Sequence, residues 1–185
     1  MTLASYVSCL RIVLIVPIIY LTYQGFWSQT SSFYNYLAFS LFIIAGLTDY
    51  LDGYIARKTR TETKLGALLD LIADKLLVSL VMVWLVFLSG DPWIAIPALI
   101  IVSRELVIST LRQYIIEKKG KNELSISFIG KSKTTIQIIG ISILILAQEV
   151  KDIWLLALIA IWFAALFSLY SLFMYVSEWS KDYLN

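Results

Sequence analysis

The sequence predicts an all-α integral membrane protein, with six transmembrane helices in a single domain over residues 1–185. Of its 185 residues, 59% are hydrophobic and 15% are charged, whereas soluble domains carry about 25% charged residues. A soluble fold of this size would have too little polar surface to cover so much apolar area. The alternating segments of a membrane β-barrel are not visible, so we expect helices to satisfy the backbone in lipid.

Six stretches approach the span length of about 20 mostly apolar residues. The first contains Pro17 and no small-residue cleavage site follows it, so we expect a retained span rather than a signal peptide. A short basic loop separates the second from the third, and Gly120 is expected to end the fourth helix. Lys131 and Lys133 begin the fifth, and the sixth lies before a short polar C-terminus. The predicted spans are 6–25, 33–56, 66–88, 93–116, 130–148 and 153–177.

Positive charges fall almost entirely on one side of this predicted topology. With both termini on the same side, that side includes the loops 57–65 and 112–133 and holds eleven Lys and Arg residues. The other side, formed by three short loops, holds only Lys151. By the positive-inside rule the first side is cytoplasmic. We therefore predict cytoplasmic termini and a polar active-site cavity at the cytoplasmic side.

Four aspartates interrupt the second and third predicted spans. Asp49 and Asp52 lie three residues apart, and Asp70 and Asp74 lie four apart, so each pair shares one helix face. The two helices are consecutive, which allows all four carboxylates to converge in one pocket. Ionisable residues in spans are costly and usually mark function, although an isolated one can also serve as a helix–helix hydrogen bond or a proton relay.

Four carboxylates in a dry pocket repel one another, and bound cations would relieve that repulsion. The chain contains no histidine, so any metal must be held by oxygen, which favours two divalent cations such as Mg²⁺ or Mn²⁺. Metal pairs bridged by carboxylates serve displacement at phosphorus. Without an imidazole, a carboxylate is also the expected proton acceptor.

Small and cationic residues stand between the two aspartate pairs. Gly53 and Gly66 would let a ligand or another backbone approach closely, Ala56 is small, and the Arg57 guanidinium suits diphosphate oxygens. Taken singly, the glycines are more typical of helix packing and Arg57 of a positive-inside anchor. Together with the aspartates, they form a pattern of fixed spacings that is too specific for these simpler interpretations.

This pattern resembles the signature of the CDP-alcohol phosphotransferases, D-x2-D-G-x2-A-R-x8-G-x3-D-x3-D, at every defined position. The resemblance implies a bacterial-type plasma (inner) membrane enzyme in which an alcohol attacks the β-phosphate of a CDP-linked lipid and releases CMP. It implies that the metals are held by Asp49, Asp52, Asp70 and Asp74. Asp74 would also be the catalytic base. A CDP site would be lined by Gly53, Ala56, Arg57 and Gly66. The resemblance also implies a homodimer among membrane lipids, and no nucleic-acid partner is expected.

A second basic set, on the fourth and fifth spans, bears on the acceptor alcohol: Arg104, Arg112, Lys131 and Lys133. Arg104 lies about 12 Å into the helix from Arg112, so we expect it to face a polar cavity, with Glu105 as a candidate partner. Lys131 and Lys133 begin a helix, where free N–H groups can meet phosphate; simple charge anchoring is the alternative. A cationic pocket beside the metals suits an acceptor that carries a phosphate, and glycerol 3-phosphate is the simplest.

Two segments around these cations resemble the phosphatidylglycerophosphate synthases within that family: S-R-E-L-V-I-S-T-L-R at 103–112 and G-K-S-K-T-T-I-Q at 130–137. The resemblance implies CDP-diacylglycerol and glycerol 3-phosphate as substrates. Leu71 stands where this subfamily usually has Pro, and Ser5 stands at the first position of its N-x2-T-x2-R motif. Arg11 keeps the last position of that motif and is a further site candidate.

Other functions stay open at this level. Phosphatidylglycerol, inositol phosphate or serine could be the acceptor in the same family. A cation-coupled transporter could use the same carboxylates, but it would need charged groups near the bilayer midplane, and here they crowd one side. A scaffold that has lost catalysis is disfavoured by the intact motif.

Overall fold

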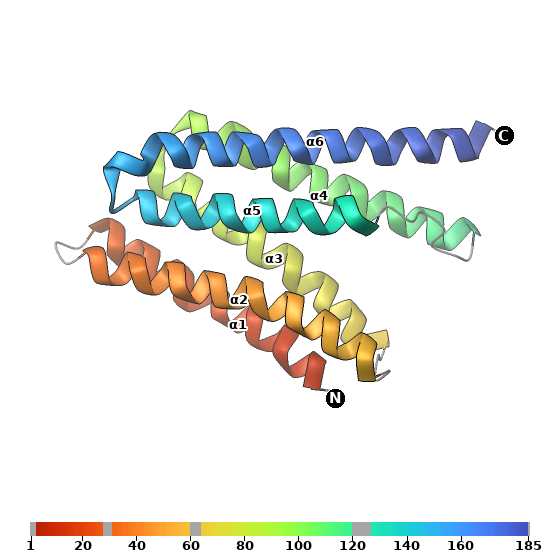
Figure 1. Ribbon diagram of the computed structural model, residues 1–185, viewed down its shortest axis with the longest axis horizontal. Coiled ribbons are helices and arrows are strands. Elements are labelled where there is room, and N and C mark those ends of the chain that lie inside the picture. The colour runs from red at the N-terminus through yellow and green to blue at the C-terminus, as the bar shows by residue number, and fades with distance from the viewer. Residues whose placement is uncertain (1–2, 28–30, 60–63, 120–126, 185) are drawn as a thin grey trace.

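The computed structural model describes residues 3–27, 31–59, 64–119 and 127–184, and it is helical throughout apart from short turns (Figure 1). Some side chains within these helices, including those of residues 49–59, 70 and 127–133, lie outside the described part. The six predicted helices are confirmed. They are α1 Leu3–Trp27, α2 Ser31–Thr59, α3 Lys64–Ser89, α4 Pro92–Lys119, α5 Ser127–Ala147 and α6 Trp154–Leu184, with a 3₁₀ turn η1 at Lys151–Ile153.

Four helical stretches among the described residues are long and apolar enough to cross a membrane: Tyr6–Trp27, Leu71–Ser89, Pro92–Ile115 and Lys151–Ser177. Among the described residues, shorter apolar stretches lie in α2 and α5, at Ser32–Thr48 and Thr134–Ala147. In sequence, the motif residues Asp49 and Lys133 lie directly beyond these stretches.

Successive helices run in alternate directions, so their connections gather at two ends of the molecule (Figure 1). The terminal end, on the right of Figure 1, holds both termini and the α2–α3 and α4–α5 connections. The opposite end holds the α1–α2, α3–α4 and α5–α6 connections. Between the ends, α1 packs against α2 and α3, α5 packs against α2, α3 and α6, and α4 packs against α3 and α6.

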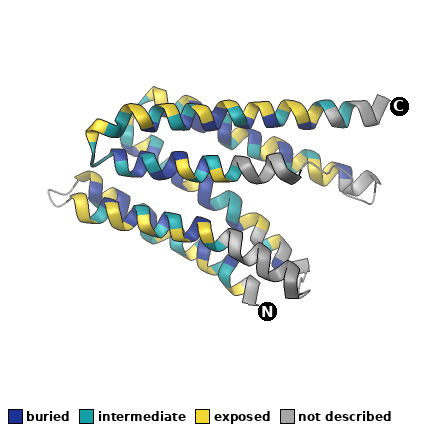
Figure 2. Ribbon diagram, viewed as in Figure 1, coloured by how far each residue is buried: buried dark blue, intermediate teal, exposed yellow. Residues whose placement is uncertain are grey.

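Every helix contributes fully buried apolar side chains to one core, for example Ile18, Phe42, Leu85, Ile101, Ile141 and Ile161. Large apolar side chains are also exposed: Phe87, Leu99 and Phe173 are each at least 70% exposed. Exposed positions, yellow in Figure 2, recur along the helices. Water would strongly disfavour so many exposed apolar side chains, whereas lipid tails accept them. This distribution confirms the predicted membrane protein.

Polar side chains, by contrast, are found inside. Arg11, Asn35, Gln137 and Ser168 are each at most 2% exposed. Polar groups lose less when they meet one another inside a helical bundle than when they face hydrocarbon. The apolar core therefore also encloses polar side chains that lipid would disfavour.

The turn between α3 and α4 shows how local sequence ends one helix and begins the next. Gly90 has a φ of 60°, a conformation that glycine adopts without strain, and its N–H donates to Val86 O at 3.0 Å. Asp91 Oδ1 then accepts the N–H of Trp93 at 2.9 Å, and Pro92 is the first residue of α4. A glycine after one helix and an Asp-Pro start to the next are favoured signals.

Candidate active site

The signature residues occupy the terminal end of α2 and α3. Asp49 and Asp52 lie within about the last three turns of α2, which ends at Thr59, and Asp70 and Asp74 lie within about the first three turns of α3, which begins at Lys64. The four connecting residues can separate the two helix ends by no more than about 18 Å. The chain thus brings both aspartate pairs to the same end of the molecule.

Continuous helix through both pairs places Asp49 beside Asp52, and Asp70 beside Asp74, on one face. The Asp74 side chain is half-buried. The other three aspartate side chains lie outside the described residues, so their convergence stays a prediction. Among the described residues, which include one of the four predicted ligands, no three acidic, His or Cys side chains form a metal-binding group.

Among the predicted CDP-binding residues, too, only some have described side chains. Gly53, Ala56 and Arg57 lie in the last turns of α2, and their side-chain surroundings lie outside the described residues. Gly66 lies in the first turn of α3 and is buried. Helix α3 also continues through Leu71, which is 44% exposed, so a leucine at this position is compatible with unbroken helix. Ser5 lies in the first turn of α1, and its side chain lies outside the described residues.

Lys75, the residue after Asp74, links α3 to α4. Its ammonium donates to the hydroxyl of Ser109 on α4, and that hydroxyl donates to the carbonyl of Glu105 at 2.5 Å. The α3 segment that carries Asp74 is therefore fastened to the helix that carries Arg104. Sequence reasoning missed Lys75, although a lysine inside an apolar span is the kind of signal that marks a functional position.

Arg104 is 5% exposed, and its guanidinium faces α6. Nε donates to the carbonyl of Ser168 at 3.2 Å, and Nη2 donates to Ser171 Oγ at 2.7 Å. Nη1 lies 3.2 Å from Glu105 Oε1, which makes an ion pair between adjacent residues. Arg104 thus avoids lipid and pairs with Glu105, and α6 is its main partner. The polar cavity that we expect it to face stays a prediction.

A guanidinium has five N–H groups, and three of those on Arg104 take part in these contacts. Within the described part of the chain, one N–H on each terminal nitrogen is left for a ligand. Gln137 of α5 also contributes, because its Nε2 donates to Ser168 Oγ at 3.5 Å. Helices α4, α5 and α6 therefore meet at Ser168. Sequence reasoning missed Ser168 and Ser171, although two serines one turn apart in an apolar helix were a visible signal.

The structure gives less detail on the other predicted basic residues. Arg112 is exposed on α4, about two turns beyond Arg104 toward the terminal end. Lys131 and Lys133 lie in the first two turns of α5, and their side chains lie outside the described residues. Arg11 on α1 is 1% exposed. The acceptor-phosphate pocket as a whole therefore stays a prediction.

Comparison with known proteins gives a consistent picture. Residues 1–170 match a family model described as CDP-alcohol phosphatidyltransferase. A Haemophilus influenzae protein named CDP-diacylglycerol–glycerol-3-phosphate 3-phosphatidyltransferase is 38% identical over 136 residues, which cover 74% of this chain and 73% of the relative. Proteins of the same name from Salmonella typhimurium and Escherichia coli (strain K12) are 37% and 36% identical over 147 residues, which cover 78% of this chain and 79% of each relative.

Proposed function

Because the chain belongs to the CDP-alcohol phosphatidyltransferase family, we propose that it transfers the phosphatidyl group from CDP-diacylglycerol to sn-glycerol 3-phosphate, giving phosphatidylglycerophosphate and CMP. The observation that carries this proposal is the intact signature on two helix segments joined by four residues. Relatives named for the same donor and acceptor support it. Family membership favours this enzyme over the transporter and the inactive scaffold.

The donor set fits hard divalent cations. Asp49, Asp52, Asp70 and Asp74 offer only oxygen ligands, and no histidine is available anywhere in the chain, which suits Mg²⁺ or Mn²⁺. When bound, two such ions would offset the repulsion among the carboxylates and the charge that develops on the phosphate. Gly53, Ala56, Arg57 and Gly66 would hold the CDP part of the donor beside them.

Asp74 would act as the general base. Its half-buried carboxylate would take the proton from the attacking hydroxyl of glycerol 3-phosphate. The hydroxyl oxygen would form a bond to the β-phosphorus of CDP-diacylglycerol, and the bond from that phosphorus to the CMP oxygen would break. Lys75 would position this carboxylate by its hydrogen bond to Ser109.

Arg104 would orient the phosphate of the acceptor. Its contacts with α6 and Glu105 hold the guanidinium in place and leave one N–H on each terminal nitrogen within the described residues, an arrangement suited to two phosphate oxygens. Arg112, Lys131 and Lys133 would add positive charge on the same side. Because serine carries no phosphate, it would gain little from this set.

The membrane orientation follows from the positive-inside rule. The terminal end holds nearly all the loop cations, so we place it, and the active site, at the cytoplasmic face of a bacterial-type plasma membrane. In this arrangement all six helices cross or enter the bilayer, and both termini are cytoplasmic. We also propose a homodimer, as the family resemblance implies.

An acceptor assay tests the function. Purified protein receives CDP-diacylglycerol, Mg²⁺ or Mn²⁺ and one acceptor, which is glycerol 3-phosphate, phosphatidylglycerol, inositol phosphate or serine, and CMP release is measured. We expect release with glycerol 3-phosphate, loss of release in Asp70→Asn, and normal release in Asp152→Asn, which changes an exposed aspartate at the opposite end. Release with another acceptor but not with glycerol 3-phosphate would reject the assignment.

A further inference from the structure

A pocket of about 390 Å³ lies at the opposite end of the molecule, far along the helices from the signature residues. It is lined by Phe26, Ser89, Ala147, Gln148, Lys151 and Trp154. These residues come from the ends of α1, α3 and α5, from η1 and from the start of α6, so three separate connections build it. Its size falls within the usual range of small-molecule sites, about 300–1,000 Å³.

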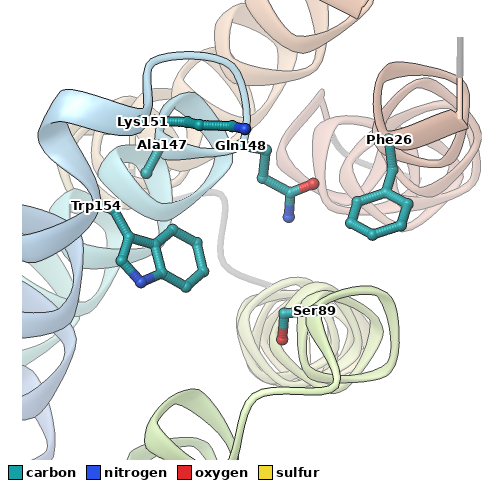
Figure 3. A pocket seen from close by; sticks show the side chains of 6 residues that line it. All are labelled: Phe26, Ser89, Ala147, Gln148, Lys151 and Trp154. Carbon is teal, nitrogen blue, oxygen red and sulfur yellow. The ribbon is translucent and has the colours of Figure 1, made fainter.

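The walls of this pocket combine aromatic rings with a cation. Figure 3 shows Phe26 and Trp154 on two sides, with Gln148 between them and Lys151 on the same side as Gln148. Lys151 is the one Lys or Arg in the three connections at this end. Among the described residues, no carboxylate forms an ion pair with it. Lys151 is exposed, and a lysine near aromatic rings at the end of membrane helices is placed where lipid phosphates lie.

The nearby acidic side chains are engaged elsewhere. Asp91 caps α4 through the N–H of Trp93. Glu149 accepts hydrogen bonds from Ser32 and from Asn35 Nδ2, both on α2. Asp152 is exposed and does not line the pocket. The charge that faces the pocket is therefore that of Lys151, which favours an anionic ligand.

Gln148 sets a second requirement for the ligand of this pocket. Its Oε1 atom is buried and has no hydrogen-bond partner within the described part of the chain. An unsatisfied buried polar atom is destabilising. A ligand that brings its own hydroxyl or N–H group would remove this penalty. The pocket thus suits a ligand with an anionic group for Lys151 and a hydrogen-bond donor for the amide.

We propose that this pocket binds the headgroup of an anionic, hydroxyl-bearing phospholipid. Its phosphodiester would meet Lys151, a headgroup hydroxyl would donate to Gln148, and the glycerol backbone would pack against Phe26 and Trp154. The acyl chains would leave along the apolar sides of the neighbouring helices. The site is separate from the active site, so this inference does not rest on the proposed catalytic function.

Lipid retention tests the proposal. Full-length protein is purified from bilayers that contain equal amounts of phosphatidylglycerol and phosphatidylcholine, and native mass spectrometry counts the lipids that stay bound. We expect one phosphatidylglycerol to be retained in preference to phosphatidylcholine, whose headgroup has no hydrogen-bond donor. Lys151→Gln should weaken this retention by about tenfold, as the loss of one charged hydrogen bond predicts. Asp152→Asn, a neighbouring charge change outside the pocket, should leave it unchanged.

Gln148→Leu separates binding from folding. Leucine removes the unsatisfied amide, so thermal stability in lipid-free detergent should be equal to or higher than that of the wild type, while the extra stability given by added phosphatidylglycerol should be lost. Equal retention of both lipids by the wild type, or unchanged retention in Lys151→Gln, would overturn the proposal. Displacement of the bound lipid by millimolar inorganic phosphate would overturn the lipid assignment in favour of a site for free anions.

Discussion

Asp74 and Arg104 are both ionisable residues inside apolar helices, but the protein surrounds them differently. Arg104 is almost fully buried, and α6 and Glu105 meet three of its N–H groups. Asp74 is half-buried at the terminal end, in a sequence that brings three other aspartates to the same end. The guanidinium is held by the protein itself, whereas converging carboxylates would repel one another and would need a cation to relieve the repulsion. In the proposed mechanism the fixed positive charge would orient the acceptor, and the metal site would serve the displacement at phosphorus.

The sharpest test of this difference is removal of the metal. Chelation with EDTA should abolish CMP release completely, because the repulsion among the carboxylates and the charge on the phosphate both depend on bound cations. Mg²⁺ or Mn²⁺ should restore activity. The protein should stay folded in EDTA, because the contacts between α4 and α6 need no metal, and thermal denaturation in detergent measures this. Full activity in EDTA would contradict the metal site.

Asp74→Asn should lower kcat by about 10²–10⁴, the range expected for loss of a general base. Asparagine keeps the shape of the side chain and one of its oxygen atoms, so binding of CDP-diacylglycerol should be largely retained. Kinetics at saturating glycerol 3-phosphate, together with a direct CDP-lipid binding measurement, separate the two effects. Near-normal turnover would exclude Asp74 as the base.

Arg104→Ala should damage both stability and acceptor use. It removes the guanidinium from Ser171 and Glu105 in a buried site, and breaking a buried ion pair costs about 3–5 kcal/mol. The KM for glycerol 3-phosphate should rise far more than the affinity for CDP-diacylglycerol falls.

Arg104→Lys is the matched control for that substitution, because it keeps the charge and loses the planar fork. It should recover part of the stability and little of the acceptor affinity. An equal loss of both ligands in Arg104→Ala would reject the phosphate assignment and leave Arg104 as a structural residue.

The helices are predictable from the sequence because a helix in lipid needs a long apolar run, and charged loops separate these runs. The aspartate spacing also predicts that each pair shares one helix face, because that relation depends only on the local helix period. The partners of Arg104 are not predictable in this way. Ser168 lies 64 residues away, and local patterns carry no information about which face of α6 meets α4. The pocket around Gln148 escapes prediction for the same reason, since three separate connections form it.

Ser171→Ala is the smallest and most selective change to the surroundings of Arg104, the fixed positive charge. It removes the 2.7 Å hydrogen bond to Nη2 and keeps the guanidinium, the Ser168 carbonyl and Glu105. Hydrogen bonds to charged groups contribute about 1.5–3 kcal/mol, so thermal denaturation should show a loss in that range. Ser180→Ala is the control on the same helix, because that hydroxyl donates to Ser177 O within α6; its effect should stay within about 0.5 kcal/mol.

The kinetic result of Ser171→Ala decides what the contact is for. If α6 orients Arg104 for the acceptor, the KM for glycerol 3-phosphate should rise severalfold in Ser171→Ala, with CDP-diacylglycerol affinity unchanged. If stability falls and both affinities stay at wild-type values, the contact only holds α4 to α6. The fixed charge would then be part of the scaffold, and acceptor recognition would depend on Arg112, Lys131 and Lys133, the cations nearer the terminal end.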